Sequence, residues 1–448
     1  MRITIAVTVF FAFFAFALAE WHVEIVDESG GVGYDPAIAL DSTGNPRIAY
    51  NRSGYGAKFA EFNGVSWEIE YIYQPSYGNA GWFDIVTDDN NLAHVVFGGG
   101  FGPGAIYTVQ DSISYDWLID YLPEYASCTS LELDSQGQPC IAILDSEEDN
   151  RFLYKDGSVW QSELIEEGND QDGFISLALD NSDRAHVAYN SAATALDVKY
   201  AERDSTGQWL ISTVDSTLSS EPRGISLALN DLNEPRISYN VAGELRYAAW
   251  NGFSWDIETV FSIDTGPMEF GTSMALDTEG CPHIVHCTSA SDSILYSVNL
   301  GAGWETSRVC AIDLDGGNPD LVLDSMNRPH IAFHSGHDDR DLMYAFNDET
   351  GIAGPSSPPA EVTDLVVSSN PFSEYLGITF SLPENSNAEL LVYDLQGRRI
   401  AAIHSGALEA GIHSASWIPG GSVAYGGYII LLQTEEGTTT CEKVVYLK

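Results

Sequence analysis

Short runs of alternating apolar and small residues recur through the first 350 residues of the chain. In residues 176–179, leucines alternate with Ser176 and Ala178, so that one face is apolar and the other carries small side chains. A period of two predicts β-strands packed on one face. A polar turn and a second apolar strand follow each run, as in AIALDSTGNPRIAY and SLALDNSDRAHVAY. The turns begin at corresponding residues: Asp41, Asp88, Asp134, Asp180, Asn230, Asp277 and Asp324.

These turn residues recur every 46 to 50 positions, and each period contains signals for four strands. A fixed period in the forties built from four strands predicts a β-propeller, in which each period forms one blade. The third strand of each period carries an aromatic ring that we interpret as part of the blade core. These aromatic residues are Phe59, Tyr107, Tyr154, Tyr200, Tyr247, Tyr296 and Tyr344.

A tryptophan opens the fourth, outermost strand of each period, where its ring would cover the blade edge and its indole N–H would reach solvent or a carbonyl. Six of these tryptophans close a period: Trp67, Trp117, Trp160, Trp209, Trp255 and Trp304. A seventh, Trp21, precedes the first period, while the last period has no such strand after it. The sequence therefore predicts an all-β fold, a seven-bladed β-propeller closed by the N-terminal strand.

Residues 1–19 have a basic start, an apolar run and an Ala-Leu-Ala end, a combination typical of a secretory signal peptide. A membrane anchor is the alternative. We expect an exported mature chain without a membrane span, with the propeller over residues 20–350. A stretch rich in Pro, Gly and Ser, residues 351–362, is expected to be a linker. Short strand signals in residues 363–448 then predict a small Ig-like β-sandwich.

The C-terminal segments SNPF, ITFSLPE, VYDLQGRRI, AGIHSASW, YGGYIILL and KVVYLK follow one another in a distinctive order. They resemble a type IX secretion C-terminal sorting domain, and equally the related FlgD-like Ig domain that ends many exported propeller proteins. The resemblance covers residues 365–448, although its glycine–aromatic phrase here reads Gly426-Gly427-Tyr428 and leaves the subfamily open. It implies bacterial-type export, with secretion or attachment at the outer surface and the secretion or anchoring machinery as a partner. An accessory sandwich without a sorting role is the alternative.

The chain carries 19 Lys and Arg against 65 Asp and Glu, a formal net charge of −46. This field repels nucleic acid and anionic membranes, so we exclude both as partners and expect a soluble monomer. It also suits cation binding or a salty habitat. The six cysteines show no C-x-x-C spacing, which argues against zinc. Cys287 and Cys310 are the favoured disulfide pair because both would end strands at one rim, and the remaining connectivity is open.

The propeller repeat broadly resembles the sialidase-like superfamily of BNR-type repeat propellers. The aspartate-box phrase of true sialidases, S-x-D-x-G-x-x-W, is missing, because the turns here read D-S-x-G-x-P. A sialidase also needs clustered arginines to bind the substrate carboxylate in a bidentate fork. The arginines on loops that could share one rim are Arg52, Arg151, Arg223 and Arg340. Sialidase activity is therefore only an alternative.

Loops before each first strand and between the second and third strands are expected to meet on one face, the usual ligand site of propellers. Aromatic rings there would stack on sugars, and carboxylates would bind hydroxyls, cations or basic peptides. The candidate ligand-binding residues on this face are Tyr34, Asp35, Arg52, Tyr77, Trp82, Asp170, Asp172, Glu221, Arg223, Glu269, Asp315, His334, His337 and Asp338.

Two loops carry weaker signals for metal ions. Asp313, Asp315, Asn318 and Asp320 are spaced by glycine as in a calcium loop, without the full EF-hand pattern, and calcium is the only cofactor that we consider. His334 with His337 could hold a transition metal or act as a base, but an ordinary polar loop is favoured. A third set stands six residues after each turn residue, and we interpret it as bonded to the turn aspartates. Its members are Arg47, His94, Cys140, His186, Arg236, His283 and His330.

These observations favour a secreted or surface-attached module that binds an extracellular glycan or protein without catalysis. A carbohydrate-active enzyme, either a glycoside hydrolase or a polysaccharide lyase using the loop face, is the first alternative. A purely structural surface protein is the second. No serine-nucleophile elbow, phosphate loop or dinucleotide fingerprint supports another chemistry.

Overall fold

The computed structural model describes residues 21–447 apart from 53–55, 75–79, 100–103, 169–173, 192–195, 217, 219, 221, 264–270, 289–292, 313–316, 337–340, 348–364, 369–371, 373–375, 383–385, 395–397, 409–410, 420–422 and 435–438. Within this described part, every helix or strand element is a β-strand. The chain divides into two compact units, Met1–Ile352 and Ala353–Lys448. The division falls in the stretch rich in Pro, Gly and Ser.

In unit 1 the described strands form seven four-stranded antiparallel sheets, numbered here in chain order. Sheet 1 contains β2 (Val32–Leu40), β3 (Pro46–Arg52), β4 (Gly56–Phe62) and β5 (Trp67–Tyr73). Sheet 2 contains β6 (Ala80–Thr87), β7 (Ala93–Gly99), β8 (Ile106–Gln110) and β9 (Trp117–Tyr121). Sheet 3 contains β10 (Ala126–Leu133), β11 (Pro139–Asp145), β12 (Asn150–Asp156) and β13 (Val159–Glu166). Sheet 4 contains β14 (Ile175–Leu179), β15 (Ala185–Ser191), β16 (Asp197–Arg203) and β17 (Trp209–Asp215).

The remaining sheets of unit 1 repeat this order. Sheet 5 contains β18 (Arg223–Leu229), β19 (Pro235–Val241), β20 (Glu244–Trp250) and β21 (Trp255–Ser262). Sheet 6 contains β22 (Thr272–Leu276), β23 (Pro282–Thr288), β24 (Ser293–Asn299) and β25 (Trp304–Ala311). Sheet 7 contains β26 (Gly317–Leu323), β27 (Pro329–His334), β28 (Leu342–Phe346) and β1 (His22–Asp27).

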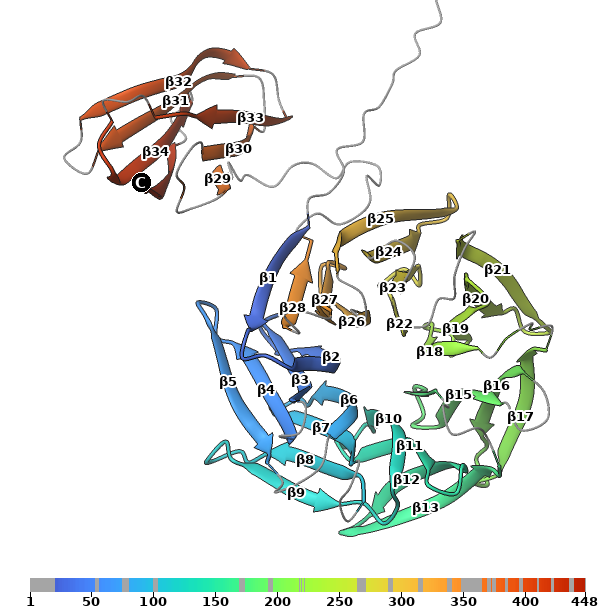
Figure 1. Cartoon of the computed structure of the whole chain (residues 1–448). Coiled ribbons are helices and arrows are strands. Elements are labelled where there is room, and N and C mark those ends of the chain that lie inside the picture. Colours follow the sequence, from blue (N-terminus) through green and yellow to red (C-terminus); the bar gives the residue numbers. More distant parts are fainter. Residues whose placement is uncertain are drawn as a thin grey trace, which may run out of the picture. The chain divides into compact units, whose positions relative to one another are not determined.

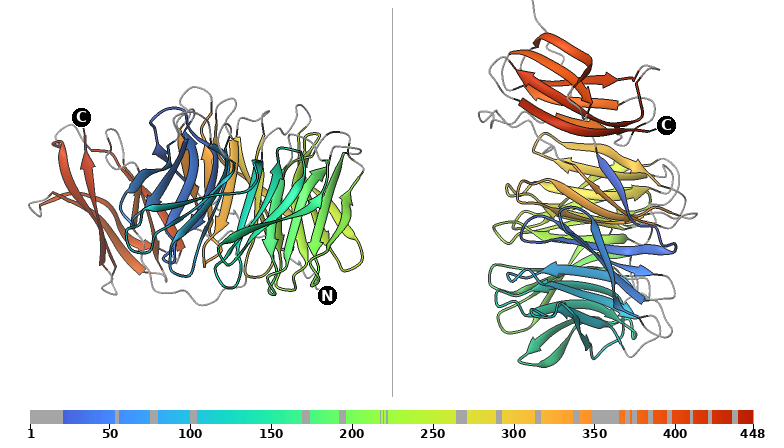
Figure 2. Two further views of the ribbon diagram at one scale, coloured as in Figure 1. Left: turned by 90° about the horizontal axis from the view of Figure 1, so that it is seen from below. Right: turned by 90° about the vertical axis from the view of Figure 1, so that its left-hand side faces the viewer.

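The sheets of unit 1 lie around a central axis, with the first strand of each sheet innermost (Figure 1). Seen from the side, the strands run between two opposite faces (Figure 2). Alternating residues of the innermost strands are small because seven strands converge on the axis. This arrangement is that of a β-propeller, as the repeat predicts.

Strand β1 pairs antiparallel with β28, from His22 opposite Phe346 to Asp27 opposite Leu342. The start of the described chain therefore supplies the outermost strand of a sheet whose other strands come from beyond residue 316. Asp27 is buried and forms an ion pair with Lys58 of β4, and its carboxylate also accepts a hydrogen bond from the Tyr50 hydroxyl at 2.7 Å. Both partners belong to sheet 1, so β1 joins sheet 7 to sheet 1.

Each tryptophan at an outermost strand packs edge-on against an aromatic ring on the third strand of the preceding sheet. The ring centroids lie 5.0–5.6 Å apart at interplanar angles of 68–74°, the favoured T-shaped geometry. The pairs are Phe59–Trp117, Tyr107–Trp160, Phe152–Trp209, Tyr200–Trp255, Tyr247–Trp304, Tyr296–Trp21 and Tyr344–Trp67. In sheet 3 the partner of the tryptophan is Phe152, which lies on the same face of β12 as Tyr154, while the Tyr154 hydroxyl donates to Glu163.

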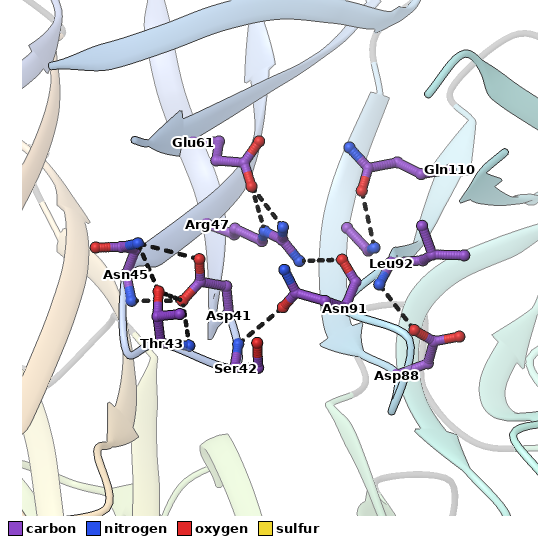
Figure 3. A network of polar contacts seen from close by, with 11 residues as sticks. Asp41, Ser42, Thr43, Asn45, Arg47, Glu61, Asp88, Asn91, Leu92 and Gln110 are labelled. Carbon is purple, nitrogen blue, oxygen red and sulfur yellow. Dashed lines mark hydrogen bonds and ion pairs between the residues drawn. The ribbon is translucent and has the colours of Figure 1, made fainter. Parts of the chain in front are cut away.

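The turn after each innermost strand closes on its first residue. Asp41 Oδ1 accepts hydrogen bonds from the N–H groups of Thr43 and Asn45, both at 2.8 Å (Figure 3). Three residues after Asp88, Asn91 has φ +64°, and its side-chain oxygen accepts the N–H of Ser42 at 2.8 Å. An asparagine tolerates this left-handed conformation and can also bond to the turn of the preceding sheet. The turns thus link neighbouring sheets as well as strands.

The residues six positions after the turn differ from the prediction in their main partner. His94, His186 and His330 share hydrogen bonds of 2.5–2.6 Å between Nδ1 and the hydroxyl of the third-strand tyrosine, and His283 makes the same bond. The turn aspartate lies 3.5–3.7 Å from Nε2, within ion-pair range but too long for a hydrogen bond. Burial lowers the pKa of His94, which favours its neutral form. These histidines are therefore structural, as expected, but their hydrogen bonds go to tyrosine.

The predicted disulfide between Cys287 and Cys310 is wrong. Both are free thiols, as are Cys128, Cys140 and Cys281. Cys287 lies on β23 and Cys310 on β25, and both pair with Ile294 of the intervening β24. Two strand spacings of about 4.8 Å place their Cα atoms beyond the limit of about 7 Å for a disulfide.

Unit 2 contains two antiparallel sheets. One contains β29 (Leu365–Ser368), β30 (Leu376–Leu382) and β33 (Gly411–Trp417). The other contains β31 (Ser386–Asp394), β32 (Arg399–Leu408), β34 (Gly426–Thr434) and β35 (Thr439–Tyr446). Side chains of both sheets, among them Phe380, Leu390, Trp417 and Ile430, share one buried core. Among the residues described in either unit, no helix is long and apolar enough to cross a membrane.

Candidate ligand-binding site on the axis

The innermost strands of sheets 1, 2, 5 and 7 each begin with a shift in register against the next strand. At these shifts Asp35, Trp82, Gly224 and Asn318 have φ values of +47°, +56°, +59° and +45°. Such bulges re-aim a side chain, and left-handed residues other than glycine concentrate at functional sites. At Gly224 a Cβ would lie 2.5 Å from the backbone nitrogen of Thr272, so only glycine fits there.

These re-aimed residues surround a cavity of about 180 Å³ at the axis, on the face opposite the aspartate turns. The described residues that line the cavity come from all seven sheets of unit 1 and include no Lys, Arg or His. Trp82 is 36% exposed, and its ring packs edge-on against Phe174 with centroids 5.6 Å apart. A second cavity of about 520 Å³ shares Asp35 and Trp82 as a wall and extends towards Tyr125.

One layer deeper, the residue four positions before each turn residue faces the axis. Its side-chain oxygen accepts a hydrogen bond from a backbone N–H on the innermost strand of the next sheet, at 2.7–3.1 Å. These bonds are Leu131 to Asp84, Leu177 to Ser130, Leu227 to Ser176, Met274 to Ser226, Leu321 to Ser273 and Ile38 to Asp320. Ala37 occupies this position in sheet 1 and has no such oxygen, so the N–H of Ile85 bonds to Asp84 of its own strand at 2.8 Å.

The carboxyl groups in the two sheets next to Ala37, Asp84 of sheet 2 and Asp320 of sheet 7, have raised pKa values. Burial raises the pKa of Asp84 to about 7, and the charge of Asp320 contributes, although N–H groups from Leu131 and Ile85 oppose the rise. Burial also raises the pKa of Asp320. Raised pKa values of neighbouring acids are a physical mark of functional sites, although structural networks produce them too.

Two further carboxyl groups belong to this region. Burial raises the pKa of Asp35, against hydrogen bonds from the Trp82 N–H at 3.4 Å and the Asn318 amide at 2.7 Å. Glu132 follows Ser130 on the same face of β10, and burial with the nearby Asp84 charge raises its pKa to about 8. The axis thus carries protonatable carboxyls next to an aromatic wall and an amide. This lining can bind hydroxyl groups, because protonated carboxyls donate and ionised ones accept.

Of the residues predicted on the ligand face, Asp35 and Trp82 line the axial cavity. Tyr34 stacks on His334 with ring centroids 4.3 Å apart, and neither ring lines this cavity. Arg52 bonds to the Tyr71 hydroxyl, and Arg223 begins β18 without reaching the lining. The predicted residues that lie outside the described part of the chain are Tyr77, Asp170, Asp172, Glu221, Glu269, Asp315, His337 and Asp338.

At the axial cavity, the arginines that the structure describes do not form the cluster that a sialidase would need. Arg151 forms ion pairs with Asp145 and Asp149, and none of the described arginines lines the cavity. Arg340 lies outside the described residues.

The calcium prediction concerns four residues, of which Asp313 and Asp315 lie outside the described part. Asn318 donates to Asp35, and Asp320 accepts bonds from the Ile38 N–H and the Ser273 hydroxyl. Among the described residues, no group of three or more His, Cys, Asp or Glu is placed to hold a metal ion.

Sequence reasoning missed Asp84, Glu132 and Phe174. The repeat itself carried the signal, because four sheets place serine where sheets 2 and 7 place Asp84 and Asp320. Glu132 likewise stands where the other innermost strands have alanine or valine. Departures from a structural repeat mark the positions to inspect first.

No protein-family model matches the chain, and no curated protein matches it. Among solved structures, an ulvan lyase of a polysaccharide lyase family, bound to -[GlcA(1-4)Rha3S]-, is 12% identical with a TM-score of 0.50, covering 71% of this chain and 96% of its own. AofleA from Arthrobotrys oligospora is 9% identical with a TM-score of 0.47, covering 64% and 90%. The Aleuria aurantia lectin is 14% identical with a TM-score of 0.43, covering 62% and 96%. The likeness to the lyase supports the propeller fold.

Proposed function

We propose that this chain is an exported carbohydrate-binding propeller, without catalysis, whose ligand enters the axial cavity beside Trp82. The observation that carries the proposal is the position of this ring. Trp82 is 36% exposed and lies at a concave site, next to the Asp35 carboxyl and the Asn318 amide. Its backbone has a left-handed conformation.

Sugars have the matching chemistry. A flat aromatic surface packs against the apolar C–H face of a sugar ring, while hydroxyls need a few directional polar partners. Asp35, Asn318 and the axial carboxyls supply both donors and acceptors at one end of the cavity. The ulvan lyase with the same fold is named for a polysaccharide, which agrees at the level of carbohydrate, although its glucuronate-containing ligand is anionic. The proposal favours a glycan over a protein partner because the cavity of about 180 Å³ suits a single ring.

A glycan array followed by titration calorimetry tests the proposal. The array selects a neutral oligosaccharide, and calorimetry compares its affinity for wild type and for the Trp82→Ala variant. We expect a loss of about tenfold or more, equal to about 1.4 kcal/mol. Tyr115→Asn, which removes a 63% exposed ring from the turn between β8 and β9, should leave binding unchanged. Equal affinity of wild type and Trp82→Ala would refute the axial site.

A glycoside hydrolase is the second candidate, favoured by the raised pKa values of Asp84 and Asp320. Two carboxyls in different protonation states are the usual acid and base of such enzymes. In this protein, Asp84 and Asp320 each accept a hydrogen bond from a backbone N–H of a neighbouring sheet, so both carboxyl groups also have a structural role. Release of reducing ends from a bound glycan, lost on Asp84→Asn, would establish hydrolysis and overturn the non-catalytic proposal.

We also propose that the sheets of unit 1 are seven blades of one ring closed by β1, and that unit 2 is an Ig-like sorting domain. The β1–β28 pairing and the tryptophan contacts from sheet to sheet support the ring. The two sheets around one core support the sandwich. In a bacterium with type IX secretion, the full chain should reach the outer surface or medium, and a chain ending at residue 352 should stay in the periplasm. Equal export of both would refute the sorting role.

A further inference from the structure

A second feature recurs where neighbouring sheets of unit 1 meet at their outer strands. The indole N–H of Trp67 donates to Glu24 at 2.8 Å, and that of Trp117 donates to Glu70 at 2.7 Å. Trp160 repeats the bond with Asp120 at 3.0 Å. The acceptor always stands three residues after the tryptophan of the preceding sheet. A carboxylate at this position therefore fills the space beside the next indole.

Between sheets 4 and 5 this carboxylate is replaced by Ser212, whose side chain is too short to take its place. Trp255 Nε1 is buried there and has no hydrogen-bond partner among the described residues. A buried donor without a partner costs about 1–3 kcal/mol. Carboxylates stand at the acceptor positions of the other two buried indoles, Glu163 for Trp209 and Glu258 for Trp304. After Arg203, Trp209 is among the hydrogen-bond donors that lower the pKa of Glu163.

A groove of about 390 Å³ opens at Ser212 and Trp255. Trp250 forms a second aromatic wall, with its ring centroid 5.4 Å from that of Trp255. The facing wall carries the side chain of Leu210, which is 57% exposed and lies on the same face of β17 as Ser212. The groove therefore offers two apolar walls and one unsatisfied donor.

The edge of the groove is acidic. Glu202 accepts a hydrogen bond from Arg184 at 2.8 Å, and Glu234 accepts from Arg236 at 2.9 Å. A carboxylate oxygen has lone pairs for further donors. The net charge of −46 adds repulsion against an anion. A suitable ligand is thus not an anion, has an apolar face, and carries hydroxyl groups that both accept and donate.

We propose that the groove between sheets 4 and 5 is a second, independent binding site, for the ring of a neutral sugar. The C–H face of the sugar packs on the tryptophan wall, one hydroxyl accepts from Trp255 Nε1, and others donate to Glu202 or Glu234. The site arises where serine replaces the carboxylate of the repeat beside a buried indole N–H, that of Trp255. The proposal shares the ligand class of the axial site but none of its residues.

Saturation-transfer NMR with the methyl glycosides of glucose, galactose and mannose tests the proposal on four full-length proteins. These are wild type, Trp82→Ala, Ser212→Glu and the double variant. Ser212→Glu restores the carboxylate of the repeat, so it should bond to Trp255, raise the melting temperature and occupy the groove. We expect one of the glycosides to give a signal with Trp82→Ala that is at least tenfold weaker with the double variant.

Two further variants separate binding from folding. Trp255→Phe keeps the ring but removes the donor, and should weaken the groove signal while the protein still melts cooperatively. Ser307→Glu makes the same change at the corresponding position in sheet 6, next to Trp21, and should leave the signal unchanged.

The NMR results distinguish a failure of the groove site from a failure of the axial site. If Trp82→Ala alone removes every signal, or if the double variant keeps the signal of Trp82→Ala, the groove site is refuted and the axial site is unaffected. If Ser212→Glu alone removes every signal, the groove site is supported and the axial site is refuted.

Discussion

The side chain of Asp320 accepts a hydrogen bond from the backbone N–H of Ile38 at 2.8 Å, across 282 positions of the sequence. The two residues lie on the innermost strands of sheets 7 and 1, β26 and β2. The bond repeats, between the last and first sheets, a contact that Ser130, Ser176, Ser226 and Ser273 make between sheets adjacent in sequence. Sheets 7 and 1 are therefore linked at the axis by this bond and at their outermost strands by the Trp67 indole N–H, which donates to Glu24 of β1.

Deletion of residues 20–27 should lower the melting temperature sharply and promote association. Without β1, the outer edge of β28 keeps unpaired N–H and C=O groups, which invite pairing with another chain. The contacts of Trp21 with Tyr296 and of Asp27 with sheet 1 are lost as well. Calorimetry and size-exclusion chromatography measure both effects. Unchanged melting with monomeric elution would contradict the contribution of β1.

The buried pair of Asp27 and Lys58 should contribute strongly to this junction. Both residues are 6% exposed, so Lys58→Met leaves an uncompensated buried carboxylate and should cost about 3–5 kcal/mol of unfolding free energy. Lys155→Met is the control, because Asp120, the partner of Lys155, is 41% exposed, and the loss should stay below about 1 kcal/mol.

The same pair predicts a pH dependence. Burial opposes ionisation of Asp27, but hydrogen bonds from Lys58, Tyr50 and Ser29 outweigh it and lower its pKa. The stabilisation is therefore complete above the ordinary aspartate pKa of about 3.9 and is lost as the pH falls through the lowered value. Chemical denaturation of wild type and Lys58→Met should show a difference that shrinks below about pH 4. A constant difference down to pH 2 would refute this assignment.

Much of the fold could be predicted from sequence because the repeat is local. The alternation around Ser176 and the turn at Asp180 define strands and their order without knowledge of distant contacts. The site could not be predicted in the same way. Trp82 and Asp35 were named because the sequence assigned them to loops at the expected face, although the structure places them at register shifts within β6 and β2. Asp84 matters instead through its neighbours in the adjacent sheets. The predicted pairing of Cys287 with Cys310 failed because the third strand of the repeat, β24 with Tyr296, lies between them, and sharing a rim does not bring their Cα atoms within disulfide range.

Ala37→Ser should stabilise the propeller by supplying the oxygen that sheet 1 lacks. By analogy with Ser130, the new hydroxyl would accept the N–H of Ile85 and release Asp84 from that bond. A hydrogen bond of this kind is worth about 0.5–1.5 kcal/mol. Ser130→Ala removes the equivalent bond, so it should change the unfolding free energy by a similar amount in the opposite direction. Equal stability of all three proteins in urea would show that these axial bonds contribute nothing measurable.

Glu132→Gln should raise stability at high pH and leave it unchanged at low pH. Burial and the charge of Asp84 raise the pKa of Glu132 to about 8, against about 4.3 in an unfolded chain. The folded state therefore holds a proton that the unfolded state releases, so the Glu132 contribution is most favourable below about pH 4.3 and declines as the pH rises to 8. Glutamine keeps the shape without the charge, and the gain in melting temperature should grow from none at pH 4 to roughly 2–4 °C at pH 8. Glu305→Gln, on the exposed face of β25, should show no such trend. A gain that is equal at pH 4 and pH 8 would mean that Glu132 does not titrate at the axis.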